Sequence, residues 1–442
     1  SRHTFIAGRY LRFLFFPAVS LGWVISEEKF FPKNNIVKYL KVRGSYGEVG
    51  NDQIGGDRFL YLPSSYGAAS DSGVNKYNFG LASNPYTSLM IVENKIGNPD
   101  LTWEKAKKMN VGVDINLFNN CLTASFDIFK EKRNNILANR STSPMIIGAN
   151  LPAYNFGEME NRGWEMDLNF RHHIQDFHYW ARFNYSFARN EIIYMDEVQK
   201  RYDYQMTTGR RKNQFFGLIF DGYYNSWEEI NALDRPKSSW SGNQLQPGDV
   251  KYVDVNQDGV IDDYDMVPIG YTPVPEIIYG FSFGAQYKGF DFSILFQGAD
   301  NVSIKYFGRS MWPFAKGEES AKSLIKERWT QERYEAGEKI TFPRLSLNPN
   351  GETDHNYRPS TLWIRDASYL RLKNLEVGYT FTGGFVKRLN LNSVRLYFNG
   401  SNLFTWTDVV DLDPEAPSRS GNVEINTYPL QKVYNIGLNI NF

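Results

Sequence analysis

The chain has 442 residues, with 49 basic and 49 acidic side chains, 16% aromatic residues and one cysteine, Cys121. The balanced charge argues against a nucleic-acid partner, because binding phosphates needs a surplus of Lys and Arg on one face. A single cysteine excludes an intrachain disulfide, and the absence of any run of about 18 apolar residues argues against a transmembrane helix.

The first residues, SRHTFIAGRYLRFLFF, contain no initiator Met and lack the pattern of a signal peptide. We therefore expect the sequence to be a mature or internal piece of a protein. Alternation of apolar and polar residues, typical of a β-strand with one apolar face, recurs from here to the end. It predicts eleven strands, near residues 15–26, 38–49, 103–118, 121–137, 157–171, 177–189, 276–287, 290–299, 366–382, 392–405 and 430–442.

The polar positions of these strands indicate a water-filled lumen. In 109–117, for example, Asn, Gly and Asp stand between the apolar residues. A dry core rejects such residues, whereas an aqueous channel accepts them. An all-β transmembrane antiparallel barrel crosses the bilayer with strands of this kind, in which only every second residue is apolar. We expect that fold class here.

A soluble β-sandwich or propeller would show the same alternation between core and solvent. Segments such as 103–118 are too long for it, because strands of globular proteins average about 5 or 6 residues. The sequence also shows no internal period of about 40 residues, which a propeller needs. Aromatic residues near the segment ends suit the girdle at a membrane interface: Trp23, Trp103, Trp180, Tyr369 and Trp406.

The connections between the expected strands alternate between short and long. The long ones span 50–102, 138–156, 190–275, 300–365 and 406–429. Short periplasmic turns that alternate with long external loops are the organisation of a bacterial outer-membrane barrel. The long segments then share the external side, and the C-terminus lies on the other side.

The segment 254–265, DVNQDGVIDDYD, lies within one external loop and has the spacing of a calcium-binding loop. Its candidate ligands are Asp254, Asn256, Asp258, the Val260 carbonyl, Asp262 and Asp265. Gly259 takes the sharp turn, Ile261 is expected to point inward, and Asp265 replaces the usual Glu with a shorter side chain. Prolines after the loop exclude a sensor helix, so the calcium would be structural. The alternative is an acidic turn whose Asp and Asn residues only favour loop geometry.

Other chemistry is sparse. His3, His172, His173, His178 and His355 form no spaced ligand set, and no hydrolase, phosphate-loop or metalloprotease motif is present. Carboxylates such as Asp127 with Glu131, or Glu165 with Asp167, are best explained as lumen charge. We expect no catalytic residues and no enzyme. The segment 317–333 predicts an amphipathic helix in an external loop.

Several motifs resemble the SusC/RagA family of TonB-dependent outer-membrane transporters of Bacteroidetes. They include GDVKYVDVNQDGVIDDYDMVPIG, ENRGWEMDLNF, SYLRLKNLEVGYTF, VRLYFNGSNLFTW and the terminal strand. The resemblance covers the chain in motif order. It implies a barrel of about 22 strands, an N-terminal plug, energy from TonB and a SusD-like lipoprotein over the outer mouth.

An odd number of strands cannot close a bacterial barrel, because both ends of the chain start from the same side. The resemblance therefore implies that 1–442 is the C-terminal half of the barrel. The plug and the other strands would belong to another portion of the same transporter, through which TonB acts. We expect the SusD-like lipoprotein to rest on 50–102, 190–275 and 300–365.

Two functions compete. The first is import of a large nutrient, an oligosaccharide or an oligopeptide, together with the lid lipoprotein. The second is an outer-membrane adhesin-type or surface-binding barrel that uses its loops without transport. The resemblance and the missing catalytic motifs favour import, and the sequence leaves the substrate class open.

Overall fold

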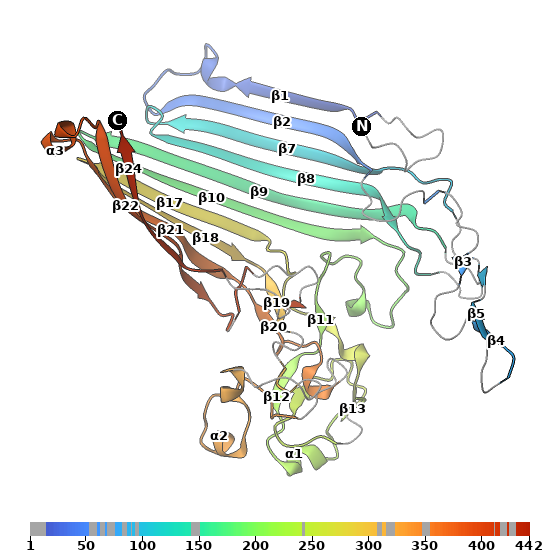
Figure 1. Ribbon diagram of the computed structural model, residues 1–442. Helices are drawn as coiled ribbons and strands as arrows, with labels where there is room; N and C mark the ends of the chain where they lie inside the picture. Colours follow the sequence, from blue (N-terminus) through green and yellow to red (C-terminus); the bar gives the residue numbers. More distant parts are fainter. Residues whose placement is uncertain are drawn as a thin grey trace.

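One antiparallel sheet of eleven strands dominates the computed structural model (Figure 1). The structure describes residues 15–52, 60–61, 67–68, 76–81, 86–89, 91–92, 97–142, 151–240, 244–306, 312–314, 323–346, 354–410, 412–415, 422–423 and 430–442. Every strand that the sequence predicts is present. In sheet order they are β1 (Ala18–Val24), β2 (Val37–Asn51), β7 (Glu104–Leu117), β8 (Leu122–Ala138), β9 (Tyr154–Ile174), β10 (Phe177–Tyr194), β17 (Ile277–Tyr287), β18 (Phe290–Asp300), β21 (Tyr369–Phe381), β22 (Ser393–Thr407) and β24 (Val433–Asn441).

The register gives the sheet one polar and one apolar face. Residues paired across the strands share a face, so Arg43, Gly112 and Asp127 lie in one row. The neighbouring row holds apolar residues: Val42, Val113, Phe126, Met166 and Tyr185. On the apolar face Ile436 is 81% exposed and Ile128 is 56% exposed. A soluble protein rarely leaves so large an apolar surface uncovered, so this face is the one that suits lipid.

The sheet is open in the described part of the chain. β1 and β24 are its edge strands, and each pairs with a neighbour on one side only. This agrees with the expectation that eleven strands do not close on themselves. Figure 1 places α3 (Gly384–Arg388) and the C-terminus at the end of the sheet opposite the long loops, as predicted. Among the described residues, no helix is long and apolar enough to cross a membrane.

Glycines on the polar face make room for aromatic rings of the next strand. Gly284 lies directly opposite Trp180, and Gly437 directly opposite Tyr397. A Cβ atom at Gly284 would lie 2.4 Å from the Trp180 indole. Covering a glycine with an aromatic ring from the neighbouring strand restores packing that the glycine itself lacks.

The long loops form a separate layer with its own hydrophobic core. Short strands build it: β11 (Phe216–Gly217), β12 (Phe220–Tyr223), β13 (Lys237–Ser238), β14 (Val250–Tyr252), β15 (Val260–Ile261), β16 (Val267–Pro268), β19 (Ser303–Tyr306), β20 (Ile364–Asp366) and β23 (Asn422–Val423). The core of this loop assembly includes Leu218, Val250, Ile261, Tyr357 and Trp363. Two smaller hairpins, β3 (Gly67–Ala68) with β6 (Ile91–Val92) and β4 (Lys76–Phe79) with β5 (Tyr86–Leu89), lie in the segment 50–102, most of which is outside the described residues.

Besides α3, further short helices occupy the loops and the turn between β1 and β2. They are η1 (Ile25–Glu27), η3 (Asp203–Gln205), α1 (Trp227–Asn231), η4 (Asp263–Asp265), η6 (Ser323–Glu327), α2 (Gln331–Glu335) and η8 (His355–Tyr357). The prediction of one helix over 317–333 is wrong where the structure describes it. Thr330 has an extended backbone and its side chain caps α2, so a new helix starts there. Residues 317–322 lie outside the described part.

The Trp180 contact predicts the effect of a single methyl group. Gly284→Ala should lower the free energy of unfolding of the intact protein by about 1–3 kcal/mol, because the rigid indole cannot yield without moving the strand. Gly280→Ala is the matched control on the same strand and face. Its Cβ atom would meet only the end of the Asn184 side chain, which can rotate away. Thermal unfolding in detergent measures both variants, and equal losses would contradict the packing role of Gly284.

Candidate functional site

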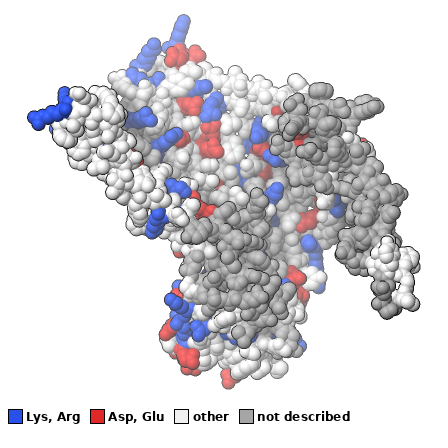
Figure 2. Space-filling model, viewed as in Figure 1, with Lys and Arg blue, Asp and Glu red and all other residues white. Residues whose placement is uncertain are grey.

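Charged side chains of both signs line the polar face of the sheet. Figure 2, viewed as Figure 1, shows Lys, Arg, Asp and Glu interspersed over the hollow of this face. Arg43 binds Asp114 at 3.1 Å and Asp127 at 2.6 Å, and Ser125 donates a hydrogen bond to Asp114. These groups are only partly buried, so water screens their attraction. The polar face therefore suits contact with water, and we call it the polar wall.

The carboxylates singled out in the sequence lie on this wall, and three of the four are engaged in ion pairs. Asp127 pairs with Arg43, Glu131 with Arg133 at 2.9 Å, and Asp167 with Arg182 at 3.4 Å. A groove beside them is lined by Ser125, Asp127, Glu165, Asp167, Asn184 and Ser186. This agrees with the interpretation of the carboxylates as lumen charge.

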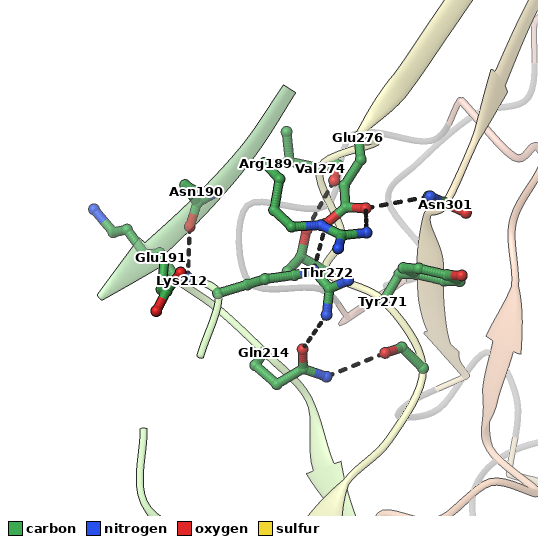
Figure 3. Close-up of polar contacts among 12 residues, drawn as sticks. Arg189, Asn190, Glu191, Lys212, Gln214, Tyr271, Thr272, Val274, Glu276 and Asn301 are labelled. Carbon is green, nitrogen blue, oxygen red and sulfur yellow. Dashed lines mark hydrogen bonds and ion pairs between the residues drawn. The ribbon is translucent and has the colours of Figure 1, made fainter. Parts of the chain in front are cut away.

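Glu276 joins the sheet to the loop assembly (Figure 3). It immediately precedes β17 and is 5% exposed. Arg189 of β10 donates to both carboxylate oxygens, at 3.0 and 2.8 Å, and Arg211, from the segment before β11, donates to one of them. Asn301 donates a further hydrogen bond at 3.2 Å. Two strand ends and one loop are thus tied to a single carboxylate.

The charge of Glu276 is stabilised by these donors. Burial alone raises the pKa of a carboxyl group, but the hydrogen bonds from Arg189 and Arg211 outweigh it and hold the pKa of Glu276 below its ordinary value. Gln214 extends the junction, since its amide accepts from Arg211 and donates to the Ile269 carbonyl. Charge-assisted bonds of this kind are stronger than neutral ones, so the junction resists separation.

A pocket of about 460 Å³ lies beside this junction. Its lining includes Glu104, Glu131, Arg133, Asn190, Lys212 and Glu276. The pocket therefore offers both acceptors and donors where the wall meets the loops. A polar solute in the lumen would find partners of either charge here.

Inside the loop assembly a second polar cluster is largely buried. Asp249 forms an ion pair with Arg344 at 2.6 Å and accepts hydrogen bonds from Arg344 Nη2 at 3.4 Å and from the Asn356 amide at 2.8 Å. His355 contacts the Val250 carbonyl at 2.7 Å and Ser238 at 2.9 Å. Burial lowers the pKa of His355. The cluster fastens the loops 190–275 and 300–365 to each other around the hydrophobic core.

The other histidines are surface residues of the sheet or lie outside the described part. His172 and His173 were expected in a turn, but β9 extends to Ile174 and includes both. His173 is paired across the strands with His178. His3 lies outside the described residues.

The acidic segment 254–265 adopts a tightly hydrogen-bonded loop. Asp254 accepts from the backbone N–H groups of Gln257 and Gly259, at 2.7 and 2.8 Å. Asn256 accepts from the N–H of Asp258, and Asp258 from that of Val260. Gly259 has a φ of +81°, as the expected sharp turn requires. Ile261 is buried in the loop core, which confirms its inward position.

Asp265, the last candidate calcium ligand, is not an exposed side chain. It is fully buried, and burial raises the pKa of its carboxyl group. One oxygen accepts from the N–H of Val255 at 2.8 Å and the other from that of Asp262 at 2.9 Å. Asp262 in turn caps η4 by accepting from the N–H of Tyr264. Asp265 therefore closes the loop on itself through backbone hydrogen bonds.

No group of three or more His, Cys, Asp or Glu side chains in the described residues is arranged to hold a metal ion. A calcium ion at 254–265 would depend on Asn256 and the Val260 carbonyl as well as on carboxylates. The loop is held from outside by η3, where Tyr204 donates to the Tyr264 carbonyl at 2.6 Å and Gln205 to the Asp263 carbonyl at 2.8 Å.

Sequence reasoning missed the Glu276 junction. Arg189 and Arg211 lie 87 and 65 residues away from Glu276 in the chain, and no spacing motif links them. The only signal was the position of Glu276 at the boundary between an expected long loop and an expected strand.

Comparison with known proteins agrees with this architecture. The family model described as "TonB dependent receptor-like, beta-barrel" matches residues 7–403. TonB-dependent receptor P3 of Formosa agariphila is 27% identical over 98% of this chain and 42% of its own length. TonB-dependent receptor SusC of Bacteroides thetaiotaomicron is 27% identical over 97% of this chain and 40% of its own length.

Solved structures show the same fold. The RagAB peptide transporter matches with a TM-score of 0.71 and 22% identity, over 99% of this chain and 44% of the matched chain. The chain thus spans less than half the length of the relatives it matches. Its two-faced sheet is the wall of an outer-membrane β-barrel. The chain belongs to the TonB-dependent receptor-like β-barrel family and is similar to its SusC and RagA members.

Proposed function

We propose that the protein imports a large nutrient across the outer membrane as the barrel component of a complex with a SusD-like lipoprotein. The observation that carries this proposal is the combination of a polar wall with a packed loop assembly at one end. A polar wall lets a hydrated solute pass. Loops of this length in a compact protein carry function or dock a partner, and these have a hydrophobic core of their own.

Energy for import would come from TonB, acting through a portion of the transporter outside this chain. The polar wall and the loops are compatible with two substrate classes. The wall offers charged groups of both signs, which suit peptides, and polar groups such as Asn184 and Ser186, which suit sugars. The RagAB match concerns the fold, so an oligosaccharide and an oligopeptide both stay open. Nothing in the arrangement of carboxylates favours catalysis over transport.

We also propose that 254–265 binds one structural calcium ion. Support comes from the ligand spacing, the turn at Gly259 and the inward Ile261, which together bring oxygen-bearing groups into one short loop. The ion would neutralise the carboxylates of the loop and reinforce the contact of the loop with η3. The alternative, an acidic turn stabilised by its own hydrogen bonds, explains the same backbone geometry without an ion.

The lid partner is tested by affinity purification of the tagged, intact protein from native outer membranes. A SusD-like lipoprotein should copurify. Asp249→Ala, which removes the centre of the buried polar cluster, should reduce that recovery because the loops lose their arrangement. Asp167→Ala, on the lumen wall, is the control and should leave recovery unchanged. Absence of any such lipoprotein from the wild-type preparation would contradict the proposal and favour a barrel that binds through its loops alone.

Calcium binding is tested by calorimetric titration of the metal-stripped intact protein. The wild type should bind one ion in this loop, and the double variant Asp254→Ala with Asp258→Ala should lose that binding while the sheet stays folded. Asp263→Ala is the matched control, because this residue lies in the same loop outside the ligand positions. If wild type and double variant take up calcium equally, the loop is only an acidic turn.

A further inference from the structure

Cations lie in two neighbouring rows of the apolar face of the sheet near its loop end. In one row Lys130 of β8 lies directly opposite Arg162 of β9. In the next row towards the loops, Lys107 of β7 lies directly opposite Lys132. Like charges placed directly opposite each other destabilise a sheet. The four residues, which we call the basic quartet, therefore form an arrangement that an external anion would relieve.

Acidic neighbours satisfy the quartet only in part. Lys130 binds Glu160 and Lys132 binds Glu158, both at 2.8 Å. The other two pairs are long: Lys107 lies 3.8 Å from Glu48, and Arg162 lies 4.0 Å from Glu191. Arg162 has the most exposed side chain of the quartet, at 62%. Its guanidinium keeps donors available for a ligand.

The charges are sorted by height on the sheet. The row of Lys130 continues to Tyr46 and Met109 on one side and to Arg189 on the other, so all its charged members are cations. Arg189 is engaged by Glu276. The acidic residues Glu48, Glu160 and Glu191 belong to the next row towards the loops. The row of Lys130 and Arg162 is therefore purely cationic, whereas the row nearer the loops mixes Lys107 and Lys132 with these three acidic residues.

The row next to Lys130 and Arg162, on the side away from the loops, carries apolar and aromatic residues on the same face. The adjoining row is Gly44, Val111, Ile128, Trp164 and Phe187. Trp164 stacks on Tyr185 with ring centroids 4.8 Å apart. Aromatic residues gather where the hydrocarbon meets the headgroups. This order puts the cationic row at headgroup level, because a charge at the midplane of the hydrocarbon would cost about 2–4 kcal/mol.

We propose that the basic quartet binds the phosphate groups of outer-leaflet lipid. Phosphate is the anion available at that level of a membrane, and Arg binds it with two parallel hydrogen bonds. Lys side chains reach the same level by extending along the apolar surface with the ammonium group in the headgroup layer. The lipid would separate the like-charged pairs and fix the height of the barrel in the membrane.

The test compares binding of phosphate-bearing lipid A and its phosphate-free form to the intact protein, by native mass spectrometry in mild detergent. The double variant Lys130→Gln with Arg162→Gln should bind the phosphate-bearing form more weakly, by roughly fivefold for each cation removed. Arg162→Lys keeps the charge and should retain most of the binding. The phosphate-free form should bind wild type and variants alike.

Lys108→Gln is the matched control, because Lys108 neighbours Lys107 on β7 but points to the polar face, where it binds Glu131. It should bind phosphate-bearing lipid as the wild type does. Equal binding by the double variant and the wild type would overturn the proposal, and so would an equal loss in Lys108→Gln. A photo-cross-linker at position 130 that captures protein and no lipid in native membranes would also overturn it.

Discussion

The hydrogen-bonding requirement of a backbone inside hydrocarbon constrains this structure most. An unpaired N–H or C=O group there costs several kcal/mol, so each strand must be paired along its length. The eleven-stranded ladder meets that requirement between its edges. Once the ladder is fixed, side chains alternate strictly between the two faces. A shift of one residue would place Arg43 or Asp127 in lipid, so the charges on the wall also select the register.

This constraint explains why the strands could be predicted. The period of two must persist for a full crossing of the membrane, which leaves a long signal in the sequence. The ends of the strands were harder to predict. β9 begins at Tyr154 and β10 continues to Tyr194, beyond the expected 157–171 and 177–189. Near these ends the strands leave the apolar layer of the membrane, so alternating residues no longer face lipid and water. The pairing of β8 with β9 is also irregular between Arg133 and Ile136.

The loop assembly follows other rules and was largely unpredictable. Its core joins residues far apart in the chain, such as Val250 and Tyr357, and no local pattern specifies such pairs. The helix expected at 317–333 is interrupted because η6 ends at Glu327 and Thr330, in extended conformation, caps the start of α2. The acidic loop at 254–265 could be predicted because its residues are consecutive in the sequence. The burial of Asp265 and its hydrogen bonds to backbone amides could not. Glu276 connects this layer to β10 and to the start of β17.

The central claim is that the sheet separates lipid on one face from water on the other. Spin labels placed one at a time at positions 124 to 128 of β8, in the intact protein with Cys121→Ser and reconstituted into bilayers, test it directly. Labels at 124, 126 and 128 should be relaxed by oxygen dissolved in the lipid, and labels at 125 and 127 by a water-soluble paramagnetic complex. Equal access of the water-soluble complex to all five positions would contradict the account.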